Sequence, residues 1–209
     1  MPSVTPLGRP TIPEYEVGVK FPALEKWSTR EVVTADKMNQ QVHDAFQFTF
    51  NPPFMKAITR GSSQHVTGGR ISEVTWGWLV SPNDWSDRTE NVTEFKAPLD
   101  GVYTVDLRIS GLVAKQGNFW CYVRNDTKGL GVSGLGFQPQ GAYSASTSIH
   151  TILPFEKGDI IRTQVYVSAG TDAELFNTSQ ANNGSWFNLE WRGAIPDGIH
   201  FKDMYGIQG

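Results

Sequence analysis

The residue types that most often carry chemistry are few in this chain and lie far apart. Its four histidines are His43, His65, His150 and His200. Zinc sites usually draw on close pairs such as His-x-His or His-x-x-x-His, and no such pair is present, so we expect packed or surface histidines and no metal site. Hydrolysis would need a nucleophile with a base and an orienting group, or paired carboxylates, and no local signature of either set occurs. The sequence predicts a protein that is not an enzyme, without catalytic residues or a cofactor.

The Gly-rich stretch GVSGLG, residues 131–136, has some features of a nucleophile elbow or a phosphate-binding loop. It lacks the glycine spacing of the first and the lysine of the second, so we expect a flexible Gly-rich loop. The single cysteine, Cys121, is expected to be a buried small hydrophobe and not a nucleophile. It cannot form a disulfide within the chain, which fits folding in a reducing cytoplasm.

The segment SPNDWSDRTEN, residues 81–91, carries three carboxylates and one tryptophan, and two more tryptophans precede it. The carboxylates could ligate calcium, but their spacing matches no defined loop such as the EF-hand, so a solvated turn is favoured. The tryptophans are Trp76, Trp78 and Trp85. If exposed, they could stack on a sugar or dock on another protein, and they are our candidate ligand contacts. In a β-sandwich, however, such residues are more often part of the core.

The composition argues against other classes of function. A net charge of −3 and a pI near 5.8 leave no basic excess to neutralise phosphates, so nucleic-acid binding has little support. No apolar stretch of about 18 residues predicts a membrane span. Residues 1–17 lack the basic start and apolar run of a signal peptide. With 209 residues and 39% hydrophobic residues, the chain can form one buried core with an appendage.

The sequence pattern divides the chain into three units: residues 1–53, 54–194 and 195–209. The first begins with an arm whose prolines favour extended backbone. A free tail and an arm docked along a neighbouring surface are equally compatible with this pattern. The arm residues that would attach it are Tyr15, Phe21 and Trp27. The last unit, residues 195–209, is predicted to be a C-terminal tail.

A short amphipathic helix is predicted over residues 34–48. Thr34 can cap it, and apolar residues follow at helical spacing. A Pro-Pro pair then ends it. A lone helix of this length cannot bury its apolar stripe, so it must pack on the rest of the chain or on other copies. Its candidate anchoring residues are Met38, Val42 and Phe46.

The unit from residue 54 to 194 predicts an all-β fold, a jelly-roll-like antiparallel sandwich. Roughly ten short β-rich runs follow one another, separated by turn residues. Residues 101–110 alternate between apolar and polar types, as a half-buried strand does. Residues 118–125 are instead apolar on both faces, at Trp120 and Tyr122 as well as at their neighbours. The outer face of this strand should therefore be covered, by another subunit or by the arm or helix of the same chain.

The residues Phe95, Gly101, Tyr103 and Val105 (FKAPLDGVYTV) resemble the signature of the complement globular-head and tumour necrosis factor superfamily. Val105 stands where that family has an aromatic residue. The later segments LPFEKGDIIRTQVYV and SWFNLEWRGA are similar to the second half of the family. The resemblance implies a jelly-roll head and three subunits around an axis, that is, a homotrimer. It makes Trp120 and Tyr122 the candidate trimer-interface residues.

Residues 27–53, with the run VVTADKMNQQV, resemble the opening of minor virion proteins from tailed bacteriophages. This resemblance implies a virion structural protein made in the bacterial cytoplasm, and attached through its arm to the capsid or tail. Tail fibre, tail tip and capsid decoration all fit, with other virion proteins as partners. A fibre-tip head that binds a carbohydrate or receptor, for example a host surface glycan, is the alternative, and a polysaccharide depolymerase is a weaker third possibility.

Overall fold

The structure is a computed structural model, and it describes residues 34–36, 38, 42, 49, 52–59, 63–80, 85–113, 115–138, 144–175, 184–195 and 201–205. The predicted anchoring residues Tyr15, Phe21, Trp27 and Phe46 lie outside the described residues. Those described between residues 35 and 49 are helical, where a helix was predicted. The amide of Met38 donates to the carbonyl of Thr34 over 3.0 Å, as in a helical turn.

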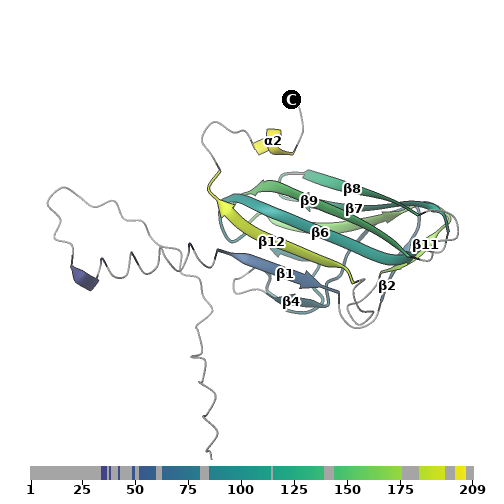
Figure 1. Ribbon diagram of the computed structural model, residues 1–209, viewed down its shortest axis with the longest axis horizontal. Coiled ribbons are helices and arrows are strands. Elements are labelled where there is room, and N and C mark those ends of the chain that lie inside the picture. Colours follow the sequence, from purple (N-terminus) through teal and green to yellow (C-terminus); the bar gives the residue numbers. More distant parts are fainter. Residues whose placement is uncertain are drawn as a thin grey trace, which may run out of the picture.

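Two antiparallel sheets face each other and enclose the core (Figure 1). Sheet A has seven strands: β1 (Phe54–Ile58), β2 (Gln64–Thr67), β4 (Trp78–Val80), β6 (Gly101–Val113), β9 (Ala145–Phe155), β11 (Asp172–Leu175) and β12 (Trp186–Gly193). Sheet B has five strands: β3 (Ile71–Glu73), β5 (Glu94–Lys96), β7 (Gly117–Asn125), β8 (Leu130–Gln138) and β10 (Ile160–Val167). The predicted all-β, jelly-roll-like antiparallel sandwich is confirmed.

The long strand β6 organises sheet A. It pairs with β9 from Gly101 opposite Phe155 to Gly111 opposite Ala145, and its other edge pairs with β12 and β11. The residues that alternate along β6 at positions 103, 105, 107 and 109 are fully buried. The alternation expected for a half-buried strand is thus present, with one side of β6 in the core.

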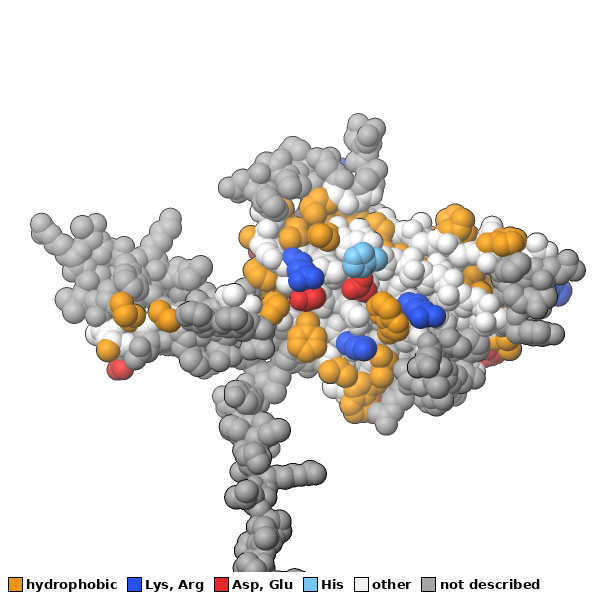
Figure 2. All heavy atoms as spheres, in the orientation of Figure 1, with side chains coloured by type: hydrophobic (Ala, Val, Ile, Leu, Met, Phe, Trp, Pro, Cys, Tyr) orange, Lys and Arg blue, Asp and Glu red, His pale blue; other side chains and the backbone are white. Residues whose placement is uncertain are grey.

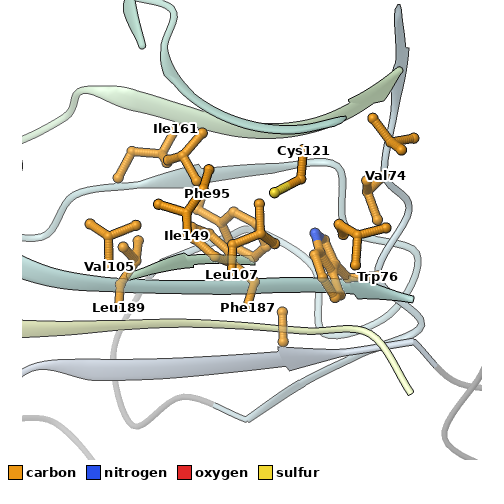
Figure 3. Packing of buried hydrophobic residues seen from close by; sticks show 14 of the residues in the cluster. Val74, Trp76, Phe95, Val105, Leu107, Cys121, Ile149, Ile161, Phe187 and Leu189 are labelled. Carbon is orange, nitrogen blue, oxygen red and sulfur yellow. The ribbon is translucent and has the colours of Figure 1, made fainter. Parts of the chain in front are cut away.

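The β-rich run from residue 71 to 80 is divided between the two sheets. Its first part, β3, pairs with β10 in sheet B, and its last part, β4, pairs with β1 in sheet A. Between them, Val74 and Trp76 are fully buried. The indole of Trp76 donates to the Thr163 hydroxyl over 2.9 Å, and its ring stacks on Phe187 at 6.1 Å. The crossing segment therefore fills the space between the sheets (Figure 3).

The Gly-rich stretch after residue 130 is a strand, so the prediction of a flexible loop there was wrong. It forms most of β8, which pairs with β7. A Cβ atom at Gly134 would lie 2.3 Å from the carbonyl oxygen of Ser148, and one at Gly136 would lie 2.8 Å from that of Ser146. Both carbonyls belong to β9. The glycines are thus required because β8 approaches the backbone of β9 too closely for a side chain.

The core lies between the sheets and is rich in aromatic and branched residues (Figure 3). Cys121 and Ile161 enter it from sheet B, and Leu107 and Phe187 enter it from sheet A. The Cys121 side chain is fully buried and its Sγ lies 3.6 Å from the Thr147 hydroxyl. Burial raises the pKa of the Cys121 thiol. Its expected role as a small buried hydrophobe is confirmed.

The C-terminal segment contributes to the sandwich. A short helix, α2 (Phe201–Met204), precedes Tyr205, whose side chain is buried. The phenol of Tyr205 donates to the carbonyl of Pro154 in β9 over 3.1 Å, and burial raises its pKa. Sequence patterns gave no sign of this contact, because one helical turn has no periodicity to detect.

No described helix is long and apolar enough to span a membrane.

Candidate functional site

The predicted ligand contacts Trp76, Trp78 and Trp85 differ in exposure. Trp76 and Trp85 are fully buried, and the Trp85 ring meets Tyr103 edge-on at 5.7 Å. Neither can stack on a ligand at the surface, which corrects the expectation for these two residues. Trp78 is half-buried on β4, opposite Ile58 of β1. Its contact with a ligand stays a prediction.

The two described anchoring residues, Met38 and Val42, are on helical backbone and are 47% and 50% exposed. Apolar side chains that attach to a partner must be accessible before they bind. Their exposure is therefore compatible with anchoring, which stays a prediction.

Trp120 and Tyr122 point outward from sheet B. Their neighbours Phe119, Cys121 and Val123 are fully buried, so alternation along β7 places the two aromatic rings on the opposite side. Both rings are half-buried, their centroids lie 6.3 Å apart, and their planes differ by only 11°. Burial, and secondarily the neighbouring Tyr166, raises the pKa of Tyr122, so its phenol stays neutral. The predicted place of both residues in a trimer interface stays a prediction.

Cross-strand register extends this pair into a larger surface that the sequence did not reveal. Tyr166 of β10 lies opposite Trp120, Ile71 of β3 lies opposite Tyr166, and Leu135 of β8 lies on the other side of Trp120. Phe137 follows on the same face of β8. We call this surface the aromatic face: Ile71, Trp120, Tyr122, Leu135, Phe137 and Tyr166. It was missed because the residues come from four strands, one of which was expected to be a loop.

A row of polar residues crosses the aromatic face beside its tyrosines. Gln164 of β10 lies opposite Tyr122 of β7, with Glu73 of β3 on one side and Ser133 of β8 beyond Tyr122. Gln164 is only 9% exposed, and within the described part of the chain its Oε1 atom has no hydrogen-bond partner. A buried acceptor without a donor is costly, and this atom is closed off from the surface, so it is a local cost to stability.

The charged groups next to the aromatic face are paired with one another. Arg162 donates to Glu73 over 2.7 Å and to Glu94 over 2.8 Å, and its Nε lies 3.2 Å from Asp126. The hydrogen bond to Glu94 is the largest cause that raises the pKa of Arg162, so this residue stays charged. Arg124 lies 3.4 Å from Asp126. This end of the face therefore offers little uncompensated charge to a ligand.

The outer face of sheet A has a different character. Four cross-strand neighbours form a row over β1, β12, β6 and β9: Lys56, Asn188, Asp106 and His150. Within this row, His150 and Asp106 form a hydrogen bond. A groove of about 340 Å³ lies over Asn188, beside Phe54. Figure 2 shows basic, acidic, histidine and hydrophobic side chains intermixed on the side where β6, β12 and β1 lie in front. This face combines charge with isolated apolar residues.

A serine, a histidine and a carboxylate meet between β2 and β11, at one end of sheet A. Glu174 accepts from Ser63 over 2.9 Å and bonds His65 over 2.8 Å. Because Ser63 contacts the carboxylate and not the imidazole, these residues do not form a nucleophile and base pair. Within the described ranges, no group of three or more His, Cys, Asp or Glu residues is placed to hold a metal ion.

These strand pairings place the chain in the class of antiparallel jelly-roll sandwiches. No protein-family model matches the chain, and no curated protein does. Among solved structures, the chain is similar to Eiger TNF from S. frugiperda, with 18% identity, 71% of this chain and 98% of that one covered, and a TM-score of 0.49. It is also similar to the globular domain of zebrafish complement 1qA protein, with 14% identity, 68% of this chain and 99% of that one covered, and a TM-score of 0.47. A third similar structure is murine APRIL, with 11% identity, 67% of this chain and 99% of that one covered, and a TM-score of 0.48.

Proposed function

We propose that this protein is a non-enzymatic structural protein whose β-sandwich head assembles with two further copies of itself. The observation that carries the proposal is the exposure of large apolar residues on the outer faces of both sheets. Phe54 and Ile152 on sheet A are 42% and 52% exposed, and Leu135 and Phe137 on sheet B are 61% and 58% exposed. Leu135 and Phe137 continue the aromatic face, and monomeric proteins rarely expose large contiguous apolar patches without a partner for them. The sequence resemblance to the complement globular-head and tumour necrosis factor superfamily, which implies a homotrimer, supports an assembly of three copies.

Two surfaces are candidates for the contact between copies. Trp120 and Tyr122 are the trimer contacts predicted from the sequence, and Phe54 with Ile152 on sheet A is the alternative. Light scattering on the full chain and on two double variants separates them: Trp120→Ala with Tyr122→Ala, and Phe54→Ser with Ile152→Ser. The variant that falls to the mass of one chain identifies the contact. If the unmodified chain itself has the mass of one chain, the proposal fails.

The finer proposal is that the trimer belongs to a tailed-bacteriophage particle, as a tail fibre, tail-tip or capsid decoration protein. Its support is the sequence of residues 27–53, together with the exposure of Met38 and Val42 on the helical segment. Its test compares incorporation into phage particles of the full chain and of a chain that begins at residue 54. The proposal expects the shortened chain to be left out of particles although its head is folded by circular dichroism. Equal incorporation of both would contradict attachment through the arm and helix.

A further inference from the structure

The helical segment before the head has the residue spacing of a coiled-coil seam. Ala35, Met38, Val42, Ala45 and Thr49 follow one another at intervals of three and four residues. They occupy positions a, d, a, d and a of successive heptads, the repeat through which helices pack on one another. The outward positions b, c and f between them are all polar: Asp36, Lys37, Gln40, His43, Asp44 and Gln47. The segment therefore has one apolar seam and one polar side.

The seam residues that the structure describes are uncovered in the single chain. Ala35, Met38, Val42 and Thr49 are on helical backbone and exposed, Met38 by 47% and Val42 by 50%. A helix of this length is marginal in water, and packing of its apolar side is what stabilises it. The head of the same chain does not cover these described side chains, so the partner of the seam lies on another molecule.

The connection to the head keeps the seam close to one end of sheet A. Pro53 is buried, and its carbonyl accepts from the amide of Trp191 in β12 over 2.9 Å. Between Thr49 and Pro53 the chain can extend by at most about 14 Å, at about 3.5 Å per residue. Heads that assemble around an axis would therefore hold their helices close together, parallel and in the same register.

The chemistry of the seam suits identical copies. In a parallel bundle, the e and g positions of neighbouring helices face each other, and here they are Asn39, Gln41, Phe46 and Phe48. None of them is charged, so identical helices meet without like-charge repulsion.

The width of the seam changes along the segment in a way that fits a bundle of three. Phe46 and Phe48 widen the apolar stripe at the end nearest the head, and a helix that contacts two neighbours needs a wider stripe than a helix in a pair. A helix packed on a globular core would carry an apolar e or g residue along its whole length. Asn39 and Gln41 do not meet that requirement.

We propose that residues 35–49 of three copies form a parallel three-helix bundle on the axis of the trimer, with Met38 and Val42 in its interior. The inference rests on the proposed trimeric head, because so short a helix does not associate alone and the heads supply the local concentration it needs. The bundle gives Met38 and Val42 a partner within the trimer, and it leaves the arm before the helix for attachment to a particle.

Disulfide trapping in the full chain tests the bundle. Met38→Cys places three thiols around the axis, within the roughly 7 Å between Cα atoms that a disulfide can span. Gln40→Cys, at an outward f position, is the matched control, and the native Cys121 is fully buried. In dilute solution with a mild oxidant, Met38→Cys should form disulfide-linked pairs at least tenfold faster than Gln40→Cys. Equal rates, or no linked pairs from Met38→Cys, would overturn the proposal.

A second pair of variants tests the seam without a cross-link. Val42→Asp places three carboxylates inside the bundle, whereas His43→Asp introduces the same residue at the neighbouring outward position. In sedimentation equilibrium, the Val42→Asp trimer should dissociate at a protein concentration at least tenfold higher than the His43→Asp trimer, and thermal unfolding checks that both heads are folded. Dissociation of both variants at the same concentration would also overturn the bundle.

The two measurements separate this inference from the proposed trimeric head. A full chain with the mass of three copies, in which Met38→Cys links no faster than Gln40→Cys, overturns the bundle alone. Selective linking of Met38→Cys, combined with a Val42→Asp chain that has the mass of one copy at every concentration, supports the bundle and overturns the contact between heads. The helices would then hold the copies together without it.

Discussion

Trp76 illustrates how one residue can connect two sheets. Its indole donates to Thr163 of sheet B while its ring stacks on Phe187 of sheet A, and the side chain is fully buried. Replacing it with alanine leaves a large cavity and an unpaired hydroxyl, so Trp76→Ala should cost about 3–5 kcal/mol of unfolding free energy. Chemical denaturation measures this loss. The half-buried Trp78 is the matched control, and equal losses at both positions would contradict the core assignment of Trp76.

Glu174 gives the described structure a predictable response to pH. Hydrogen bonds from His65 first, and from Ser63, lower the pKa of the Glu174 carboxyl in the folded chain. A lowered folded-state pKa means that the carboxylate contributes stability above its unfolded-state pKa, and that this contribution is lost as pH falls through the folded-state value. Glu174→Gln should therefore be slightly less stable than the unmodified chain at neutral pH, and equally stable in acid.

Urea unfolding of both proteins across the acidic range measures this difference. The effect is small because nearly half of the side chain is exposed to solvent. A difference that stays constant from neutral to acidic pH would show that the carboxylate charge has no part in it.

The tryptophans also show what residue types alone can predict. Their number indicated a large aromatic core or a sugar-binding surface, and both interpretations were open for Trp76 and Trp85. Which side a side chain faces depends on the sheet its segment joins, and residues 71–80 change from sheet B to sheet A. Period-two alternation does not reveal that change, so the alternation pattern alone could not decide between core and surface for Trp76.

At the scale of elements, β8 makes a sharp prediction. A Cβ atom at Gly134 would lie 2.3 Å from the Ser148 carbonyl oxygen, and β9 cannot move away without losing its pairing with β6. Gly134→Ala should therefore cost about 1–3 kcal/mol of unfolding free energy, as overpacking does. Gly131→Ala is the control in the same strand, because its nearest contact would be a milder 3.0 Å. Thermal unfolding compares them, and equal stability of the two variants would contradict the close approach of β8 to β9.

The long strands were predictable and the surface they form was not. β6 and β7 have regular patterns of apolar residues, and both occur where the pattern predicted them. The glycines of β8 indicated a loop, because glycine is common in loops and its packing role depends on a neighbour far along the chain. The aromatic face needs the register of β3, β10, β7 and β8 at once, and a single sequence does not contain that register in readable form.

In the whole molecule, the inner face of each sheet packs into the core. The two outer faces are chemically distinct from each other. The outer face of sheet A mixes charged groups with Phe54 and Ile152, whereas that of sheet B carries the aromatic face beside paired charges. A head with two such different surfaces can use one to contact its own copies and the other to contact a ligand. The solution masses of the variants proposed above identify the face that contacts the other copies.

Sedimentation equilibrium of the full chain over a wide range of concentrations tests the proposed trimeric head most directly. We predict one species with three times the mass of the 23.2 kDa chain, unchanged on dilution. A species with the mass of one chain at every concentration would contradict the trimeric head, and the exposed apolar residues of both faces would then require partners other than the protein itself.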